Sequence, residues 1–247
     1  MRDTRLIMGM PIEIQVVGGA EAAPLLEDAF AYLGEVDERF STYKEESEIS
    51  RINRGALALT DASDQMQEIF TRAEDAKRAT EGYFDIKRPD GKLDPSGIVK
   101  GWAIRNAAAR LRAAGVTDFF INAGGDIASA GKNEKGGEWS VGIENPFDRA
   151  QIVKVVYPKG KGVATSGSYI RGAHIYDPHA PSRALTELAS ITVIGPDVEQ
   201  ADVLATAAFA MGKRGLAFLE SQEGFEAYGI ETGVATMTSG FAQYTKP

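Results

Sequence analysis

The segment Asp94-Pro-Ser-Gly-Ile-Val-Lys-Gly-Trp-Ala103 is a polar turn that leads directly into a helical run. Ile98, Trp102 and Leu111 give this run one apolar face. The first turn of a helix leaves N–H groups without partners inside the helix, and its positive dipole end attracts anions, phosphate above all. Lys100 adds a positive charge in the same turn. The segment therefore predicts a helix start that can bind an anion.

The same turn also allows a purely structural interpretation. Ser96 is a suitable N-cap residue, and Asp94 would then belong to an ordinary capped helix start. In the functional interpretation, Asp94 and Lys100 contact a ligand, and the backbone carbonyl of Gly97 faces a cation because glycine permits close approach.

A second tight turn, Asn122-Ala-Gly-Gly-Asp-Ile127, follows the apolar segment 119–121. Two glycines let a backbone approach a flat ligand closely. They could equally form a simple turn that the side chain of Asp126 hydrogen-bonds. Taken together, two such turns around one site indicate a nucleotide or dinucleotide ligand.

Composition excludes several classes of protein. The 247 residues carry a net charge of -8 with 43% hydrophobic residues, which argues against a nucleic-acid partner and for a globular fold. No apolar run reaches the length of a transmembrane segment, and the first eight residues lack the apolar core of a signal peptide. We expect a cytoplasmic protein, with a trimmed periplasmic form as the alternative. The absence of cysteine excludes thiolate chemistry, and two histidines argue against a His-rich zinc site, so any metal should be a hard, oxygen-liganded cation.

Hydrophobic periodicity recurs along the whole chain. It predicts strands at 5–17, 116–121, 138–144, 152–157, 161–165, 188–194, 225–230 and 233–238, and helices at 22–40, 62–80, 97–114, 197–211 and 213–221. Ser47 is predicted to cap a further short helix, and Gly115 is predicted to end the helix at 97–114. Because no repeat or linker divides the chain, we expect one α+β or mixed domain.

Asp202 and Thr206 are four residues apart in a predicted helix, so their side chains share one face. Apolar neighbours predict that this helix is buried, and a buried carboxylate needs a charged partner or a metal. A carboxylate with a hydroxyl suits Mg²⁺. Alternatively, Asp202 interacts with the helix dipole and Thr206 hydrogen-bonds within its own helix.

His174 and His179 are the two histidines of the chain. His174 precedes an Ile-Tyr segment near the turn Thr165-Ser-Gly167, which makes it the better candidate for a general base. A structural role is the alternative. His179 follows Pro178 in a polar loop, where we expect it to be exposed.

The order of these motifs resembles the ApbE family, the FAD:protein FMN transferases. The resemblance extends from residue 8 to residue 212. It rests on Met8-Gly-Met-Pro-Ile12, Phe40-Ser-Thr-Tyr43, Ser47-Glu-Ile-Ser-Arg-Ile-Asn53, Gly82-Tyr-Phe-Asp-Ile86, Asp94-Pro-Ser-Gly-Ile-Val-Lys-Gly101, Asn122-Ala-Gly-Gly-Asp-Ile127, Ala164-Thr-Ser-Gly167, His174-Ile-Tyr-Asp-Pro178 and Ala201-Asp-Val-Leu-Ala-Thr206. Each motif is weak alone, whereas their joint order is specific. The resemblance implies a single α+β, T-fold-like domain over residues 1–247, with mixed or antiparallel sheets and flanking helices.

The resemblance also implies a reaction. The enzyme would transfer FMN from FAD to a Thr or Ser hydroxyl of a target flavoprotein subunit, through a phosphoester bond, with Mg²⁺ and with release of AMP. The implied Mg²⁺ ligands are the Gly97 carbonyl, Asp202 and Thr206, and the implied base is His174. The implied contacts with FAD are Met8, Ser41, Thr42, Tyr43, Asp85, Asp94, Lys100 and Tyr176.

Two other functions fit the same residues. One is a FAD pyrophosphatase that yields FMN and AMP, with water in place of the acceptor hydroxyl. The other is a non-catalytic flavin-binding protein, against which the metal pair and the base argue, because storage requires neither. Compared with many members of the family, the segment 87–93 is short, and we expect it to open the flavin side of the pocket or to change acceptor recognition.

Overall fold

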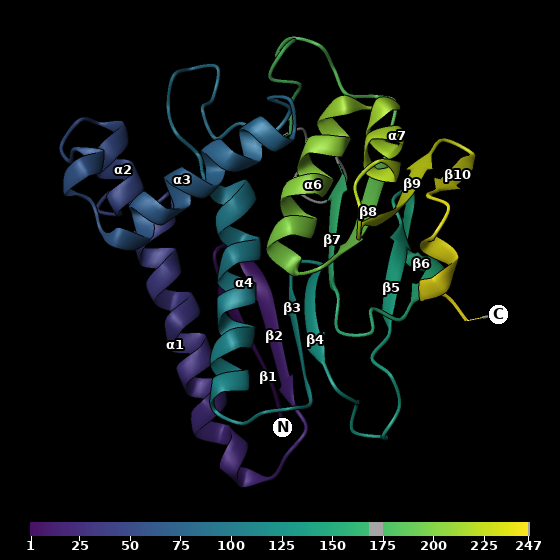
Figure 1. Ribbon diagram of the computed structural model, residues 1–247. Coiled ribbons are helices and arrows are strands. Elements are labelled where there is room, and N and C mark those ends of the chain that lie inside the picture. Colours follow the sequence, from purple (N-terminus) through teal and green to yellow (C-terminus); the bar gives the residue numbers. More distant parts are fainter. Residues whose placement is uncertain (168–174, 247) are drawn as a thin grey trace.

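A computed structural model of the protein describes residues 1–167 and 175–246. Within these ranges, eight antiparallel strands form one sheet in the order β1-β2-β3-β4-β7-β8-β9-β10, and β5 and β6 form a separate hairpin (Figure 1). The strands are β1 (Arg2–Ile7), β2 (Met10–Val16), β3 (Phe119–Ala123), β4 (Asp126–Ala130), β5 (Val141–Asn145), β6 (Asp148–Val156), β7 (Gly162–Gly167), β8 (Ser190–Gly195), β9 (Glu226–Glu231) and β10 (Val234–Met237).

Helices α1, α4, α6 and α7 cover one face of this sheet, with α4 packed between α1 and α6, whereas α2 and α3 lie beyond its end (Figure 1). Their bounds are α1 (Ala23–Phe40), α2 (Glu48–Asn53), α3 (Asp64–Ala79), α4 (Ser96–Ala113), α6 (Val198–Met211) and α7 (Arg214–Glu220), with short 3-10 turns η1 (Ala20–Ala22), η2 (Leu59–Asp61) and η3 (Phe241–Tyr244). Among the described helices, none combines the length and the apolar composition that a membrane crossing requires.

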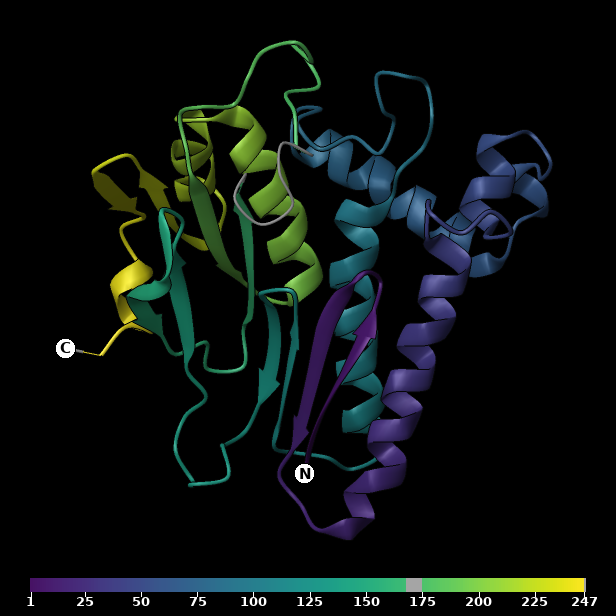
Figure 2. The same ribbon diagram turned by 180° about the vertical axis from the view of Figure 1, so that it is seen from behind.

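The opposite face of the sheet is covered differently. The β5–β6 hairpin and η3 pack on its C-terminal half, where Ile127, Ile143, Val156 and Phe241 share one apolar cluster (Figure 2). Because apolar side chains fill both faces of this half, β8 is buried at every position. An α+β fold with antiparallel pairing and flanking helices was predicted, and the structure confirms it.

Two helices are buried on several sides rather than along one stripe. On α6, every residue except Gln200 and Thr206 is buried. The first half of α4 is also buried, from Ile98 through Ile104, and Lys100 lies within this stretch. A lysine in such a place requires a partner charge, which the functional site supplies.

Some local predictions are confirmed and others are wrong. Ser47 caps α2, since its hydroxyl accepts a hydrogen bond from Ser50 N at 3.1 Å. The predicted strand 5–17 is instead a hairpin of β1 and β2, which turns at Met8 and Gly9 with φ of 53° and 70°. The prediction of one strand rested on the alternation of Ile12, Ile14 and Val16, which lies after the turn, and it overlooked Gly9, a residue type that readily adopts positive φ.

The N-cap assigned to Ser96 is also wrong. Ser96 is the first residue of α4, and Pro95 stands in the cap position without a side-chain cap hydrogen bond. The carboxylate of Asp94 accepts a hydrogen bond from Ser96 N at 3.1 Å instead. Asp94 therefore stabilises the helix start, as the structural interpretation of this turn predicted.

Candidate active site

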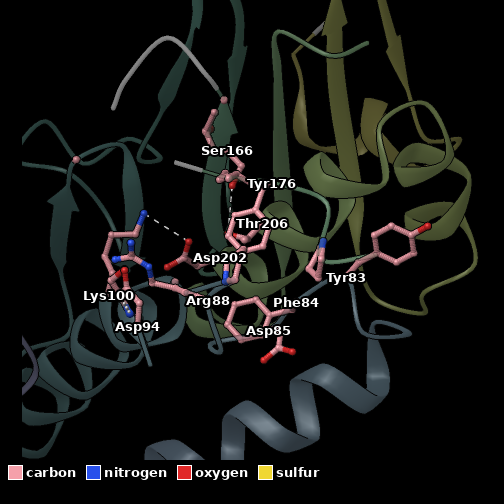
Figure 3. Close-up of a pocket in the computed structure, with 18 of the residues that line it drawn as sticks. Tyr83, Phe84, Asp85, Arg88, Asp94, Lys100, Ser166, Tyr176, Asp202 and Thr206 are labelled. Carbon is pink, nitrogen blue, oxygen red and sulfur yellow. Dashed lines mark hydrogen bonds and ion pairs between the residues drawn. The ribbon is translucent and has the colours of Figure 1, made fainter. Parts of the chain in front are cut away.

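A cavity of about 420 Å³ opens where the N-terminal end of α4, the middle of α6 and the end of β7 meet (Figure 3). The turn between β3 and β4, the segment 83–89 and the segment 175–178 complete its wall. Its lining comprises Tyr43, Tyr83, Phe84, Asp85, Arg88, Pro89, Asp94, Ser96, Gly97, Lys100, Gly124, Thr165, Ser166, Gly167, Ile175, Tyr176, Pro178, Asp202 and Thr206. Segments that are far apart in the chain thus converge on one pocket.

Lys100 connects two carboxylates at the inner end of this pocket. Its Nζ lies 2.6 Å from Oδ2 of Asp126 and 3.4 Å from Oδ1 of Asp202 (Figure 3 shows the latter contact). Asp126 is fully buried, and Lys100 and Asp202 are more than 90% buried. At these depths the ion pairs are poorly screened by solvent, so the three charges hold one another in place.

The role suggested for Asp126 within its own turn is wrong. The side chain of Asn122 accepts the hydrogen bond from Gly125 N that stabilises the turn, at 3.0 Å. Asp126 instead points to Lys100 and accepts a hydrogen bond from Thr165 N at 3.3 Å. It therefore connects β4 with β7 and α4, a contact that only the folded chain creates.

The predicted metal ligands lie in the same pocket. Asp202 and Thr206 are one helical turn apart on α6, and Gly97 lies on the first turn of α4. Oδ2 of Asp202 accepts a hydrogen bond from Gly101 N at 3.2 Å, and the Thr206 hydroxyl lies 3.4 Å from that of Ser166. Carboxylate, hydroxyl and carbonyl oxygens are the donors that Mg²⁺ prefers, so this donor set fits the ion.

The other wall carries the predicted contacts with FAD. Asp85 forms an ion pair with Lys77 at 2.7 Å and accepts a hydrogen bond from Lys87 N. The Tyr176 hydroxyl donates to the carbonyl of Lys87 at 3.3 Å. Burial, reinforced by the charge of Asp85, raises the pKa of the Tyr176 phenol, so it stays a hydrogen-bond donor at neutral pH. Tyr43 reaches the rim with a 99% exposed side chain, a surface on which a flat ring could stack.

The structure does not bring every predicted residue to the pocket wall. Within residues 1–167 and 175–246, Met8, Ser41 and Thr42 are not part of the lining. Met8 packs on the main apolar core at the hairpin turn, and Ser41 follows the last residue of α1. Their contacts with FAD stay predictions. His174, the predicted base, lies outside the described residues, whereas His179 is exposed as expected.

Sequence reasoning did not assign roles to Arg88 or Ser166, and the role that it suggested for Asp126 was wrong. Asp126 and Ser166 belong to motifs that were recognised, Asn122-Ala-Gly-Gly-Asp-Ile127 and Ala164-Thr-Ser-Gly167, but their partners lie on other elements. Arg88 belongs to the segment 87–93, which the sequence analysis noted for its short length compared with many family members, without assigning a role to any one residue. The tertiary structure places all three at the site.

Gly101 sets the distance between the two helices that carry these residues. A Cβ atom at this position would lie 2.7 Å from the Glu199 Cα and 2.9 Å from the carbonyl oxygen of Val198. We expect Gly101→Ala to separate α4 from α6 and to lower the free energy of unfolding by about 1–3 kcal/mol. Thermal denaturation measures this loss.

The matched control is Gly34→Ala in the middle of α1. A Cβ atom there meets nothing within 4 Å, so this variant should be neutral or slightly more stable. If Gly101→Ala also unfolds at the wild-type temperature, close packing at Gly101 does not position the site.

Comparisons with known proteins agree with this geometry. A model of the ApbE family matches residues 8–88 and 86–229. The chain is 27% identical to the FAD:protein FMN transferase of Vibrio cholerae serotype O1, over 85% of this chain and 80% of that protein. It is 26% identical to the FAD:protein FMN transferase of Haemophilus influenzae, over 76% of this chain and 72% of that protein.

Two solved structures share the fold over almost their whole length. The flavin transferase ApbE from Vibrio cholerae has a TM-score of 0.86 at 24% identity, covering 99% of this chain and 98% of that one. The ApbE protein from Thermotoga maritima has a TM-score of 0.88 at 20% identity, covering 100% and 99%. The chain belongs to the ApbE family. The prediction that it is an enzyme, a transferase, is confirmed by relatives that carry this name.

Proposed function

We propose that this protein is a FAD:protein FMN transferase. It binds FAD in the pocket and transfers the FMN half to a Thr or Ser hydroxyl of a target flavoprotein, in a Mg²⁺-dependent reaction that releases AMP. The observation that carries the proposal is the convergence of Lys100, Asp202, Thr206 and Gly97 in one pocket that also contains Asp85, Asp94 and Tyr176. The names of the relatives support the same activity.

The proposed reaction exchanges one P–O bond for another. The acceptor hydroxyl oxygen bonds to the phosphorus on the FMN side of the diphosphate, and the bond from that phosphorus to the bridging oxygen breaks. The bridging oxygen keeps the electron pair and leaves as part of AMP, while the hydroxyl proton passes to a base. Phosphoryl transfer of this kind depends on positioning and on stabilising charge on the oxygens.

The residues of the pocket suit these tasks. Asp202, Thr206 and the Gly97 carbonyl would hold Mg²⁺, which supplies Lewis-acid stabilisation of phosphate oxygens when it is bound. Lys100 is fixed by Asp126, so its positive charge is already in place before a ligand arrives. Tyr176 and Phe84 offer aromatic faces to the rings of the substrate.

The test is incubation with FAD, Mg²⁺ and a protein domain that carries a candidate acceptor Thr, followed by intact-mass measurement. We expect a mass gain equal to FMN, which EDTA abolishes. Release of free FMN and AMP with a range of acceptor domains left unmodified would indicate a pyrophosphatase instead. FAD that is bound and never cleaved would indicate a carrier protein.

His174 is proposed as the base that accepts the proton of the acceptor hydroxyl. We expect His174→Ala to lower the transfer rate by about 10²–10⁴-fold, the usual contribution of a general base, and to leave FAD binding intact. Transfer is followed by intact mass and binding by flavin fluorescence. Exposed His179 offers the matched control, because His179→Ala should keep most of the activity. Equal rates for wild type and His174→Ala would remove His174 from this role.

A further inference from the structure

The segment 87–93 forms a small, well-braced hairpin beside the pocket. Lys87 pairs with Leu93, and Arg88 N donates to the carbonyl of Lys92 at 2.8 Å. Gly91 closes the turn with φ of 83°, and its N–H donates to the carbonyl of Arg88 at 2.9 Å. This pattern makes the hairpin an ordered element.

Side chains from two other parts of the molecule hold the base of this hairpin. The Asn53 amide donates to the Leu93 carbonyl and accepts from Leu93 N, both at 2.8 Å. On the other strand, the Tyr176 hydroxyl donates to the Lys87 carbonyl at 3.3 Å. The hairpin is therefore fixed relative to α2 and to the segment that carries Tyr176.

Arg88 and Pro89 are the residues of this hairpin that line the cavity, and Figure 3 shows the Arg88 side chain reaching across it toward Lys100 and Asp94. Its guanidinium forms an ion pair with Asp90 on the same turn, at 3.2 Å, and both side chains are almost half exposed. Such a surface pair contributes little, so a ligand anion can replace Asp90 at small cost.

The charges of the pocket lining indicate why a second cationic side chain, besides Lys100, would be needed to bind a diphosphate. Among the described residues of the lining, Asp85, Asp94 and Asp202 are negative, whereas Arg88 and Lys100 are positive. Lys100 already neighbours the carboxylates of Asp126 and Asp202. A diphosphate would bring more negative charge into this pocket, and a guanidinium is suited to bind phosphate oxygens in pairs.

We propose that Arg88 binds the diphosphate of the dinucleotide substrate, and that the 87–93 hairpin serves to position its guanidinium. This inference rests on the proposed function. It assigns to the short segment a role in substrate binding inside the pocket. Lys87 and Lys92 lie on the same hairpin but outside the described lining, so they provide a comparison within one element.

The test measures Kd by isothermal titration calorimetry for FAD, ADP and riboflavin, with wild type, Arg88→Gln, Arg88→Lys and Lys92→Gln. We expect Arg88→Gln to weaken FAD and ADP by roughly tenfold at low salt and to leave riboflavin unchanged, because riboflavin has no phosphate. Arg88→Lys should be intermediate, and Lys92→Gln should match wild type. The difference should shrink as salt rises, because the guanidinium is partly exposed.

Other outcomes would overturn the inference. Equal loss of riboflavin affinity would show that Arg88 shapes the flavin side of the pocket. An unchanged Kd for FAD with a raised KM for the acceptor would place Arg88 in acceptor recognition. If wild type binds FAD and Arg88→Gln binds it equally well, the inference on Arg88 fails while the proposed function stands. If wild type does not bind FAD, the proposed function fails with it.

Discussion

Replacing Asp202 with Asn should abolish Mg²⁺-dependent transfer of FMN while the protein stays folded and still binds FAD. The amide keeps the shape of the side chain and can still accept the hydrogen bond from Gly101 N. It loses the negative charge that would hold the cation and that faces Lys100 at 3.4 Å. We expect a rate loss of about 10³-fold or more, the scale of removing a principal electrostatic group from an active site.

Initial rates from intact mass, recorded over a series of Mg²⁺ concentrations, measure this loss, and flavin fluorescence measures FAD binding. Asp197→Asn is the matched control on the same helix. Asp197 caps α6 by accepting a hydrogen bond from Gln200 N, and Asn is an equally good cap. The control should keep wild-type activity. A wild-type rate in Asp202→Asn at the same Mg²⁺ concentration would remove Asp202 from the metal site.

The second large effect concerns stability. Asp126→Asn should lower the free energy of unfolding by about 3 kcal/mol, because it removes one partner of a buried ion pair and leaves the Lys100 charge poorly compensated. For a chain of this size, that loss corresponds to a fall in Tm of about 6–12 °C. The same variant should transfer FMN more slowly, since Lys100 loses the contact that fixes its position.

Thermal denaturation measures this loss of stability, and an ion pair on the surface provides the control. Asp75 forms an exposed ion pair with Arg78, so Asp75→Asn should change stability by no more than about 0.5 kcal/mol. Combining Asp126→Asn with Lys100→Met should cost less than the sum of the two single variants, because both charges are then removed. An unchanged Tm for Asp126→Asn would show that this pair does not hold the site together.

Local features of the chain were predictable where the determining contacts are close in sequence. The helical spacing of the apolar residues predicted α1, α3 and α4 to within about two residues at each end. The cap at Ser47 was predictable because its hydroxyl bonds a backbone N–H only three residues further along the chain, that of Ser50. The joint order of the motifs indicated the family, although no single motif did.

Other features needed the folded chain. The hairpin at Met8 and Gly9 was missed because the alternation seen from Ile12 to Val16 was extended back past Gly9. Strand β4 was not predicted because its first two residues were interpreted as part of a turn and its last three were not interpreted. The roles of Asp126 and Arg88 were missed for a different reason. Each depends on neighbours from other elements, and no spacing along the sequence reports such contacts.

The sequence by itself determined the residue types that the chemistry requires, and it placed Asp202 and Thr206 on one helical face because an α-helix repeats every 3.6 residues. Only the tertiary structure decided that this face meets Lys100, and that Lys100 meets Asp126. The physical reason is the packing of α6 against α4 at Gly101, where the absence of a Cβ atom allows the two backbones to approach. Burial at that contact then obliges the three charges to compensate one another.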